Sequence, residues 1–120
     1  MEDKLGLLID KLENKGNNHV YYDEYLDMEL EIKKFSLRRF SKMQEGADKN
    51  TDKALETMYK IIYEHVPLFQ SDELFEKSGV QKRENVIAKI YDEKLKPIEK
   101  IFNFINVEVY QLDVDVEKKS

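Results

Sequence analysis

Residues 26–43, LDMELEIKKFSLRRFSKM, decide the fold class because the spacing of apolar residues changes within them. In the first half, apolar residues occupy every second position, which is typical of a half-buried strand: Leu26, Met28, Leu30 and Ile32. In the second half they recur every third position, which places them along one side of a helix: Leu37, Phe40 and Met43. Ser36 precedes them and is a residue type that caps helix N-termini. The stretch therefore predicts a strand that leads directly into a helix.

The residues before this stretch indicate a helix and a second strand. Residues 4–15 space their leucines and isoleucine as an amphipathic helix does, and Gly16 is a natural left-handed end. Residues 19–25, HVYYDEY, are rich in valine and tyrosine, which favour strands. A turn at Asp23 and Glu24 would pair them with the following strand. We therefore expect a β segment at about 19–34, formed as a hairpin or as an extended segment.

Three helices are expected in the second half of the chain. The first covers residues 51–66 and is stopped by Pro67, and a short one covers 71–79, between a serine cap and a glycine end. The longest covers about 82–106 and contains Pro97. Because its apolar face continues in phase across the proline, we expect a kink rather than two abutting helices.

The last residues differ from the rest. In the segment 107–120, apolar and acidic residues alternate, which indicates either a strand or an acidic tail. The sequence thus predicts a mainly α (α+β) fold. Residues 1–106 would form a single small domain of about four helices with an N-terminal β-hairpin or extended segment, followed by the C-terminal strand or tail.

Composition excludes several classes of function. The chain has 120 residues, enough for one domain, and a net charge of -5 argues against nucleic-acid binding as the default. No apolar run approaches the roughly 18 residues of a membrane helix, so we expect a cytosolic protein without membrane association. There is no cysteine, and the two histidines, His19 and His65, lie far apart. Since no catalytic or nucleotide-binding motif occurs either, we expect no enzymatic activity, no cofactor and no metal.

Charge reverses abruptly at residue 33. Acidic residues are concentrated in 23–31, and the basic stretch 33–42, KKFSLRRFSK, follows at once. The basic stretch is either a patch for nucleic acid or an acidic protein, or the solvated faces of a strand and a helix. We favour solvated faces, because charge is expected opposite an apolar stripe. Among partners, the neighbouring acidic run favours protein over nucleic acid.

The order of these elements resembles that of the tail assembly chaperones of long-tailed bacteriophages and prophages. Members of that group often have a strand that leads into a helix, as residues 30–37 do here. The resemblance covers most of residues 5–105, and 107–120 have no counterpart. It rests on four segments: LGLLIDKLENK (5–15), LEIKKFSLRRFSKM (30–43), MYKIIYEHVPLF (58–69) and ENVIAKIYDEKLKPIEKIF (84–102).

The resemblance implies a non-enzymatic protein of the host bacterial cytoplasm. It would bind the phage tape measure protein, keep it soluble and help recruit tail tube protein. This task requires an apolar groove or stripe for an amphipathic helix, together with self-association, so we expect a homo-oligomer. Apolar residues on more than one side of segment 59–63 also indicate burial, either centrally or against a partner. The candidate contacts, chosen from this sequence and not transferred from the family, are Phe35, Leu37, Phe40, Met43, Tyr59, Ile61 and Tyr63.

An alternative function belongs to a different class. The chain could be a small phage or mobile-element inhibitor or regulator that binds a host protein. The carboxylates of residues 23–31 and 113–117 would then act as a nucleic-acid mimic.

Overall fold

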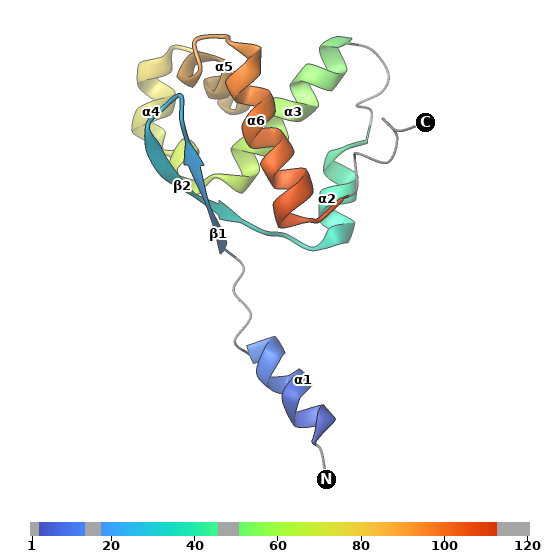
Figure 1. Ribbon diagram of the computed structural model, residues 1–120. Helices are drawn as coiled ribbons and strands as arrows, with labels where there is room; N and C mark the ends of the chain where they lie inside the picture. The colour runs from blue at the N-terminus through green and yellow to red at the C-terminus, as the bar shows by residue number, and fades with distance from the viewer. Residues whose placement is uncertain (1–2, 14–17, 46–50, 113–120) are drawn as a thin grey trace.

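The computed structural model describes residues 3–13, 18–45 and 51–112. Within them the chain forms six α-helices and one two-stranded antiparallel sheet, which confirms the expected mainly α (α+β) class (Figure 1). The elements are α1 (Lys4–Glu13), β1 (Asn18–Asp23), β2 (Met28–Lys33), α2 (Leu37–Met43), α3 (Thr51–His65), α4 (Asp72–Ser78), α5 (Val86–Ile90) and α6 (Leu95–Phe104). Short 3-10 turns at Pro67–Gln70 and Arg83–Asn85 and a π-helical turn at Ile105–Val109 complete the order.

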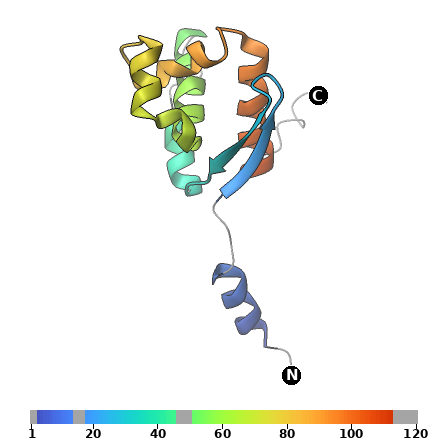
Figure 2. The same cartoon turned by 90° about the vertical axis from the view of Figure 1, so that its left-hand side faces the viewer.

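Helix α3 is the centre of the fold. It lies between α6 on one side and α4 on the other, as Figure 2 shows, and it also packs against α2 and α5. Its adjacent residues Ile61 and Ile62 are both fully buried, although they point to different sides of the helix. The chain's own elements thus cover Ile61 and Ile62 on two sides of this helix.

The expected β-hairpin forms, and the side chains that it buries in the hydrophobic core come mainly from β2. Its register runs from the pair Asn18 and Lys33 to the pair Asp23 and Met28. Leu30 and Ile32 are buried, as their alternation predicts. The turn is longer than expected, since it covers residues 24–27 and includes Leu26.

The turn has a left-handed residue and an aspartate cap. Asp27 has a φ of 56°, a conformation that aspartate tolerates better than most residues. One carboxylate oxygen of Asp23 accepts a hydrogen bond from the backbone N–H of Leu26 at 3.0 Å. This Asx-type contact closes the turn without glycine.

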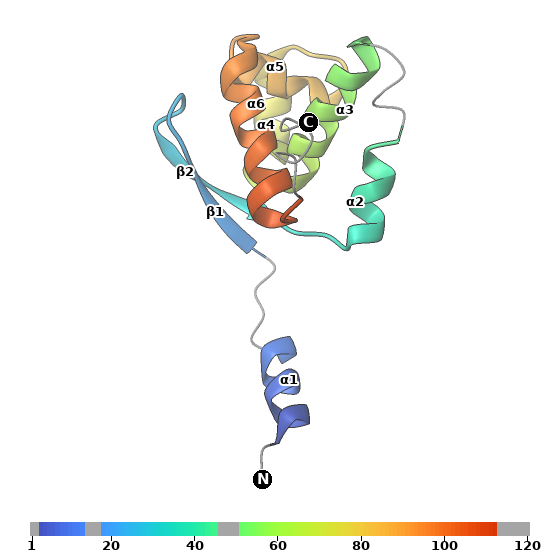
Figure 3. The same ribbon diagram turned by 45° about the vertical axis from the view of Figure 1, so that its right-hand side comes forward.

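The transition from strand to helix follows the sequence closely. The Ser36 hydroxyl accepts a hydrogen bond from the backbone N–H of Arg39 at 3.1 Å, so it caps α2. Phe40 is buried and Met43 is partly buried, but Leu37 is exposed. The buried side of α2 therefore runs through Phe40 and Met43 and does not include Leu37. In Figure 3, α2 lies alongside α3, with the hairpin on the far side of α6.

The prediction of a single long helix over 82–106 is wrong. The chain forms α5 and α6, separated by a break in which Asp92 and Glu93 have left-handed φ values of 54° and 56°. Two successive left-handed residues reverse the chain and cannot belong to an α-helix. Pro97 is the third residue of α6, where a backbone N–H has no partner within the helix. It therefore fits in the first turn of this helix and causes no kink.

The segment after α6 is not a strand in the part that the structure describes. Ile105–Val109 forms a π-helical turn, and Val109 and Tyr110 are buried in the core. The packed domain therefore extends past residue 106 to at least Tyr110. The rest of the expected strand or tail, including the carboxylates of 113–117, lies outside the described residues, as does the expected helix end at Gly16.

Helix α1 stands apart from the other elements (Figure 1). It confirms the expected N-terminal helix as far as Glu13. Its apolar side chains are exposed: Leu5, Leu7, Leu8, Ile9 and Leu12. No helix in the described part of the chain is long and apolar enough to cross a bilayer.

Candidate protein-interaction surfaces

Two of the residues predicted to contact a partner are buried in the core. Phe40 is 2% exposed and Ile61 is 0% exposed. Since neither side chain can reach another protein in this fold, their assignment as contact residues is corrected. Leu37 is 63% exposed and stays available. The other four are partly buried at the edge of the core: Phe35, Met43, Tyr59 and Tyr63.

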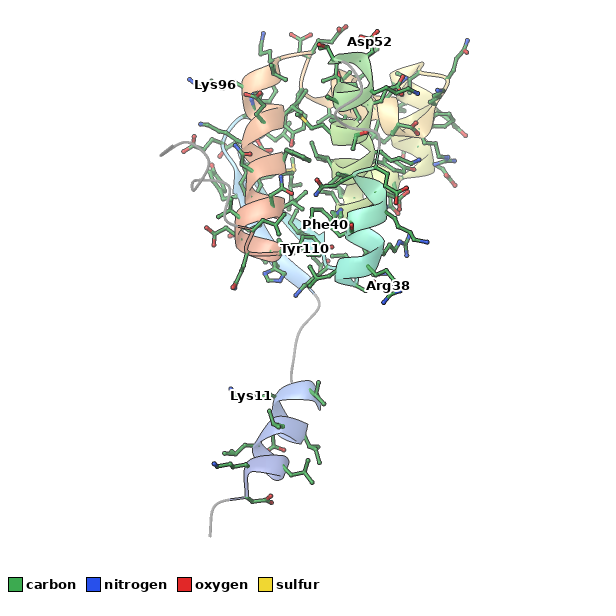
Figure 4. The ribbon with its side chains drawn as sticks, turned by 90° about the vertical axis from the view of Figure 1, so that its right-hand side faces the viewer. Lys11, Arg38, Phe40, Asp52, Lys96 and Tyr110 are labelled. Carbon is green, nitrogen blue, oxygen red and sulfur yellow. The ribbon has the colours of Figure 1, made fainter. Side chains whose placement is uncertain are left out.

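Phe40 is buried because it belongs to a cluster around His65. Its ring stacks on Tyr110, with centroids 3.8 Å apart and planes within 9° (Figure 4). Both rings, and that of Phe35, contact His65 edge-on. The cluster joins α2, the end of α3 and the turn after α6, which are far apart in the sequence.

A chain of hydrogen bonds runs through this cluster. His65 Nδ1 lies 2.7 Å from the carbonyl oxygen of Ile61, which can only accept, so Nδ1 carries a proton. In the neutral ring Nε2 must then accept, and the Tyr110 hydroxyl donates to it at 2.7 Å. The same hydroxyl accepts from the backbone N–H of Phe35 at 2.9 Å. Burial lowers the pKa of His65, so the ring stays neutral and every polar atom of it is bonded.

A second buried polar pair fixes the hairpin turn to α5. Tyr91 donates its hydroxyl to Asp23 at 2.5 Å, and both residues are buried. Burial, followed by the hydrogen bond to Asp23, raises the pKa of the Tyr91 hydroxyl. Asp23, expected on an acidic face, thus has a structural role. The exposed acids of this stretch are Glu24, Asp27, Glu29 and Glu31.

The basic stretch 33–42 covers aromatic rings. Arg39 lies over the Phe35 ring at 4.3 Å from its centroid and 3.8 Å from a carboxylate oxygen of Glu64. Lys33 lies over the same ring and Lys34 over Tyr110. These contacts agree with solvated faces around an aromatic cluster.

A mainly apolar hollow lies beside the hairpin turn, and we name it the hairpin–α4 groove. Its volume is about 420 Å³. Leu68 and Met28 are 57% and 43% exposed at its mouth, and buried Phe69 contributes to its wall. Glu73 and Lys77 stand at the rim and pair with each other at 3.6 Å. The remaining lining residues are Leu26, Ser71, Leu74 and Ile90.

A second hollow of about 360 Å³ lies between α3 and α6, and we name it the α3–α6 groove. Its apolar lining comes from both helices: Ala54, Leu55, Met58, Tyr59, Leu95 and Ile98. The charged residues that line it are Glu93 and Glu99, both exposed. Among the predicted contact residues, Tyr59 lines the α3–α6 groove, and none lines the hairpin–α4 groove.

No pattern in the sequence directly predicts these grooves. The walls of the hairpin–α4 groove combine one or two apolar side chains from each of several elements. The α3–α6 groove combines four apolar side chains of α3 with two of α6. Exposed leucines at element boundaries, such as Leu68 after Pro67 and Leu95 before Pro97, are the nearest local sign.

A metal site and a similarity to known proteins are the two remaining sources of functional evidence. In residues 3–13, 18–45 and 51–112, no group of three histidine or carboxylate side chains is arranged to hold a metal ion. Comparison of the chain with protein-family models, curated proteins and solved structures finds no match.

Proposed function

We propose that this chain is a non-enzymatic binding protein that holds an apolar helical segment of a partner in the hairpin–α4 groove. The observation that carries the proposal is the lining of this groove, where six apolar side chains from the hairpin, residues 68–69, α4 and α5 meet at an open hollow of about 420 Å³. An amphipathic helix that lays its apolar side into such a groove is a recurrent mode of peptide recognition.

The partner that fits best is the tape measure protein of a long-tailed phage. The chain would then act as a tail assembly chaperone in the host cytoplasm, keeping this long helical client soluble while tail tube subunits assemble around it. Two features support this assignment: the order of elements from residue 5 to residue 105, and an open apolar groove within a highly charged chain, of which 38% is charged.

Co-expression with a candidate tape measure protein from the same locus tests the proposal. The wild-type chain should keep the client in the soluble fraction and elute with it. Leu68→Glu places a charge at the mouth of the groove and should abolish both effects, because an apolar helix cannot pair with it. Since Leu68 is 57% exposed, the variant should fold normally, which circular dichroism checks.

Leu37→Glu is the matched control. Leu37 is 63% exposed and lies on α2, outside the groove. Leu37→Glu should therefore leave client binding unchanged. Loss of binding with Leu37→Glu but not with Leu68→Glu would move the contact to α2, and an insoluble client with the wild-type chain would overturn the proposal.

A further inference from the structure

Helix α1 carries an apolar stripe that is left open. At 100° per residue, four apolar side chains share one side of the helix: Leu5, Leu8, Ile9 and Leu12. Lys4 and Lys11 lie seven residues apart and therefore along the same edge of this stripe. Neither lysine forms an ion pair within the described residues.

The α3–α6 groove is complementary to this stripe in polarity and in charge. Its walls are apolar, and its charged lining consists of two carboxylates, Glu93 and Glu99. In the part of the chain that the structure describes, neither forms an ion pair. A helix with an apolar stripe and two lysines along one edge would cover the apolar walls and bring opposite charges together.

Two other hollows match α1 less well. In the hairpin–α4 groove, Glu73 and Lys77 already neutralise each other. The hollow between α2 and α3 is polar and carries five basic residues against three acidic ones, so it would repel lysines: Arg39, Lys42, Lys53, Lys60 and Lys82 against Glu45, Glu56 and Glu84.

We infer that α1 of one copy binds in the α3–α6 groove of a second copy, so that two chains exchange their N-terminal helices. In Figure 4, α1 with Lys11 lies at the end of the molecule opposite to Asp52 and Lys96, which mark the first turns of α3 and α6. The groove is lined near these first turns, by Thr51, Leu95 and their neighbours. This placement favours a second copy over the chain's own groove.

The exchange also explains how a short helix supports a dimer. A helix of ten residues is only about 15 Å long, and a single such contact is small. A two-fold exchange makes the contact twice, which brings the buried area toward the roughly 1,200–2,000 Å² of a stable interface. The inference concerns a different surface from the hairpin–α4 groove and does not depend on the proposed client.

Charge reversal in the full-length chain tests the exchange. The helix variant Lys4→Glu/Lys11→Glu and the groove variant Glu93→Lys/Glu99→Lys should each raise the dimer dissociation constant roughly 10- to 100-fold, because four ion pairs per dimer become like-charge contacts. Light scattering coupled to size exclusion over a dilution series measures this. As the control for the groove variant, Glu76→Lys/Glu108→Lys makes the same change in net charge outside the groove and should leave the dimer intact.

Mixing the two variants decides between exchange and self-docking. In a mixed dimer, the lysine-bearing α1 meets the acidic groove, and the glutamate-bearing α1 meets the basic groove. Two variants that are monomeric alone should therefore dimerise when mixed. A wild-type chain that stays monomeric at every concentration, or a mixture that does not recover the dimer, would overturn the inference.

Discussion

Replacing Tyr110 with phenylalanine tests whether the hydrogen-bond chain through His65 stabilises the fold. The substitution removes one hydroxyl and keeps the ring, so the stack on Phe40, with centroids 3.8 Å apart, is preserved. Nε2 of His65 then loses its donor, and the backbone N–H of Phe35 loses its acceptor. Among the described residues, neither group has a second hydrogen-bond partner.

The magnitude follows from burial. His65 is fully buried, and an unsatisfied buried polar group costs about 1–3 kcal/mol. The N–H of Phe35 is only partly buried, so water recovers some of its loss. We expect Tyr110→Phe to lower the free energy of unfolding by about 2–3 kcal/mol, a large part of the roughly 5–15 kcal/mol typical of a domain.

Urea denaturation followed by circular dichroism measures this loss. With a slope of about 1–3 kcal/mol per molar urea, the midpoint should fall by about 1 M. Tyr25→Phe is the matched control, because the Tyr25 side chain is 43% exposed and its hydroxyl makes no hydrogen bond within the described residues. It should change stability by less than about 0.5 kcal/mol. Equal effects of the two substitutions would refute the reasoning.

Three further predictions concern single residues. Because burial lowers the pKa of His65 below 6.5, the unfolded chain binds the proton more readily, so the free energy of unfolding should decrease as the pH falls below about 6.5; a pH-independent urea midpoint between pH 7 and 5 would contradict this. Tyr91→Phe leaves the second oxygen of the buried Asp23 carboxylate without its donor, while the first still accepts from the N–H of Leu26, and should lower stability by about 1–3 kcal/mol, measured by urea denaturation. Asp92 has a left-handed φ of 54°, which glycine adopts without strain, so Asp92→Gly should raise the free energy of unfolding by up to about 1 kcal/mol and raise the thermal midpoint with it. Lys94 has an extended backbone, so Lys94→Gly should not raise the midpoint.

The sequence predicts most reliably where adjacent residues decide the structure. The Ser36 cap of α2 and the span of α4 from its Ser71 cap to left-handed Gly79 depend on contacts within four residues. The burial of Leu30 and Ile32 follows from an alternation that only a strand can satisfy. In each case the local preference and the fold agree.

The break between α5 and α6 shows where this approach fails. The apolar period runs in phase from residue 86 to residue 105, so local pattern indicates one helix. The break is instead supported by tertiary contacts, since Tyr91 at the end of α5 bonds to Asp23 of the hairpin and packs against Phe69. These contacts hold Asp92 and Glu93 in conformations that neither residue prefers.

The candidate site divides in the same way. Local patterns were enough to predict an amphipathic N-terminal helix, a strand that leads into a capped helix, and more apolar side chains than one core needs. Which of these side chains are covered depends on the tertiary structure. Phe40 and Ile61 are buried by partners distant in the sequence, while Leu68 and Leu95 are left at groove mouths. Burial depends on the packing of whole elements, and a local pattern shows only which side of an element is apolar, not what lies against it.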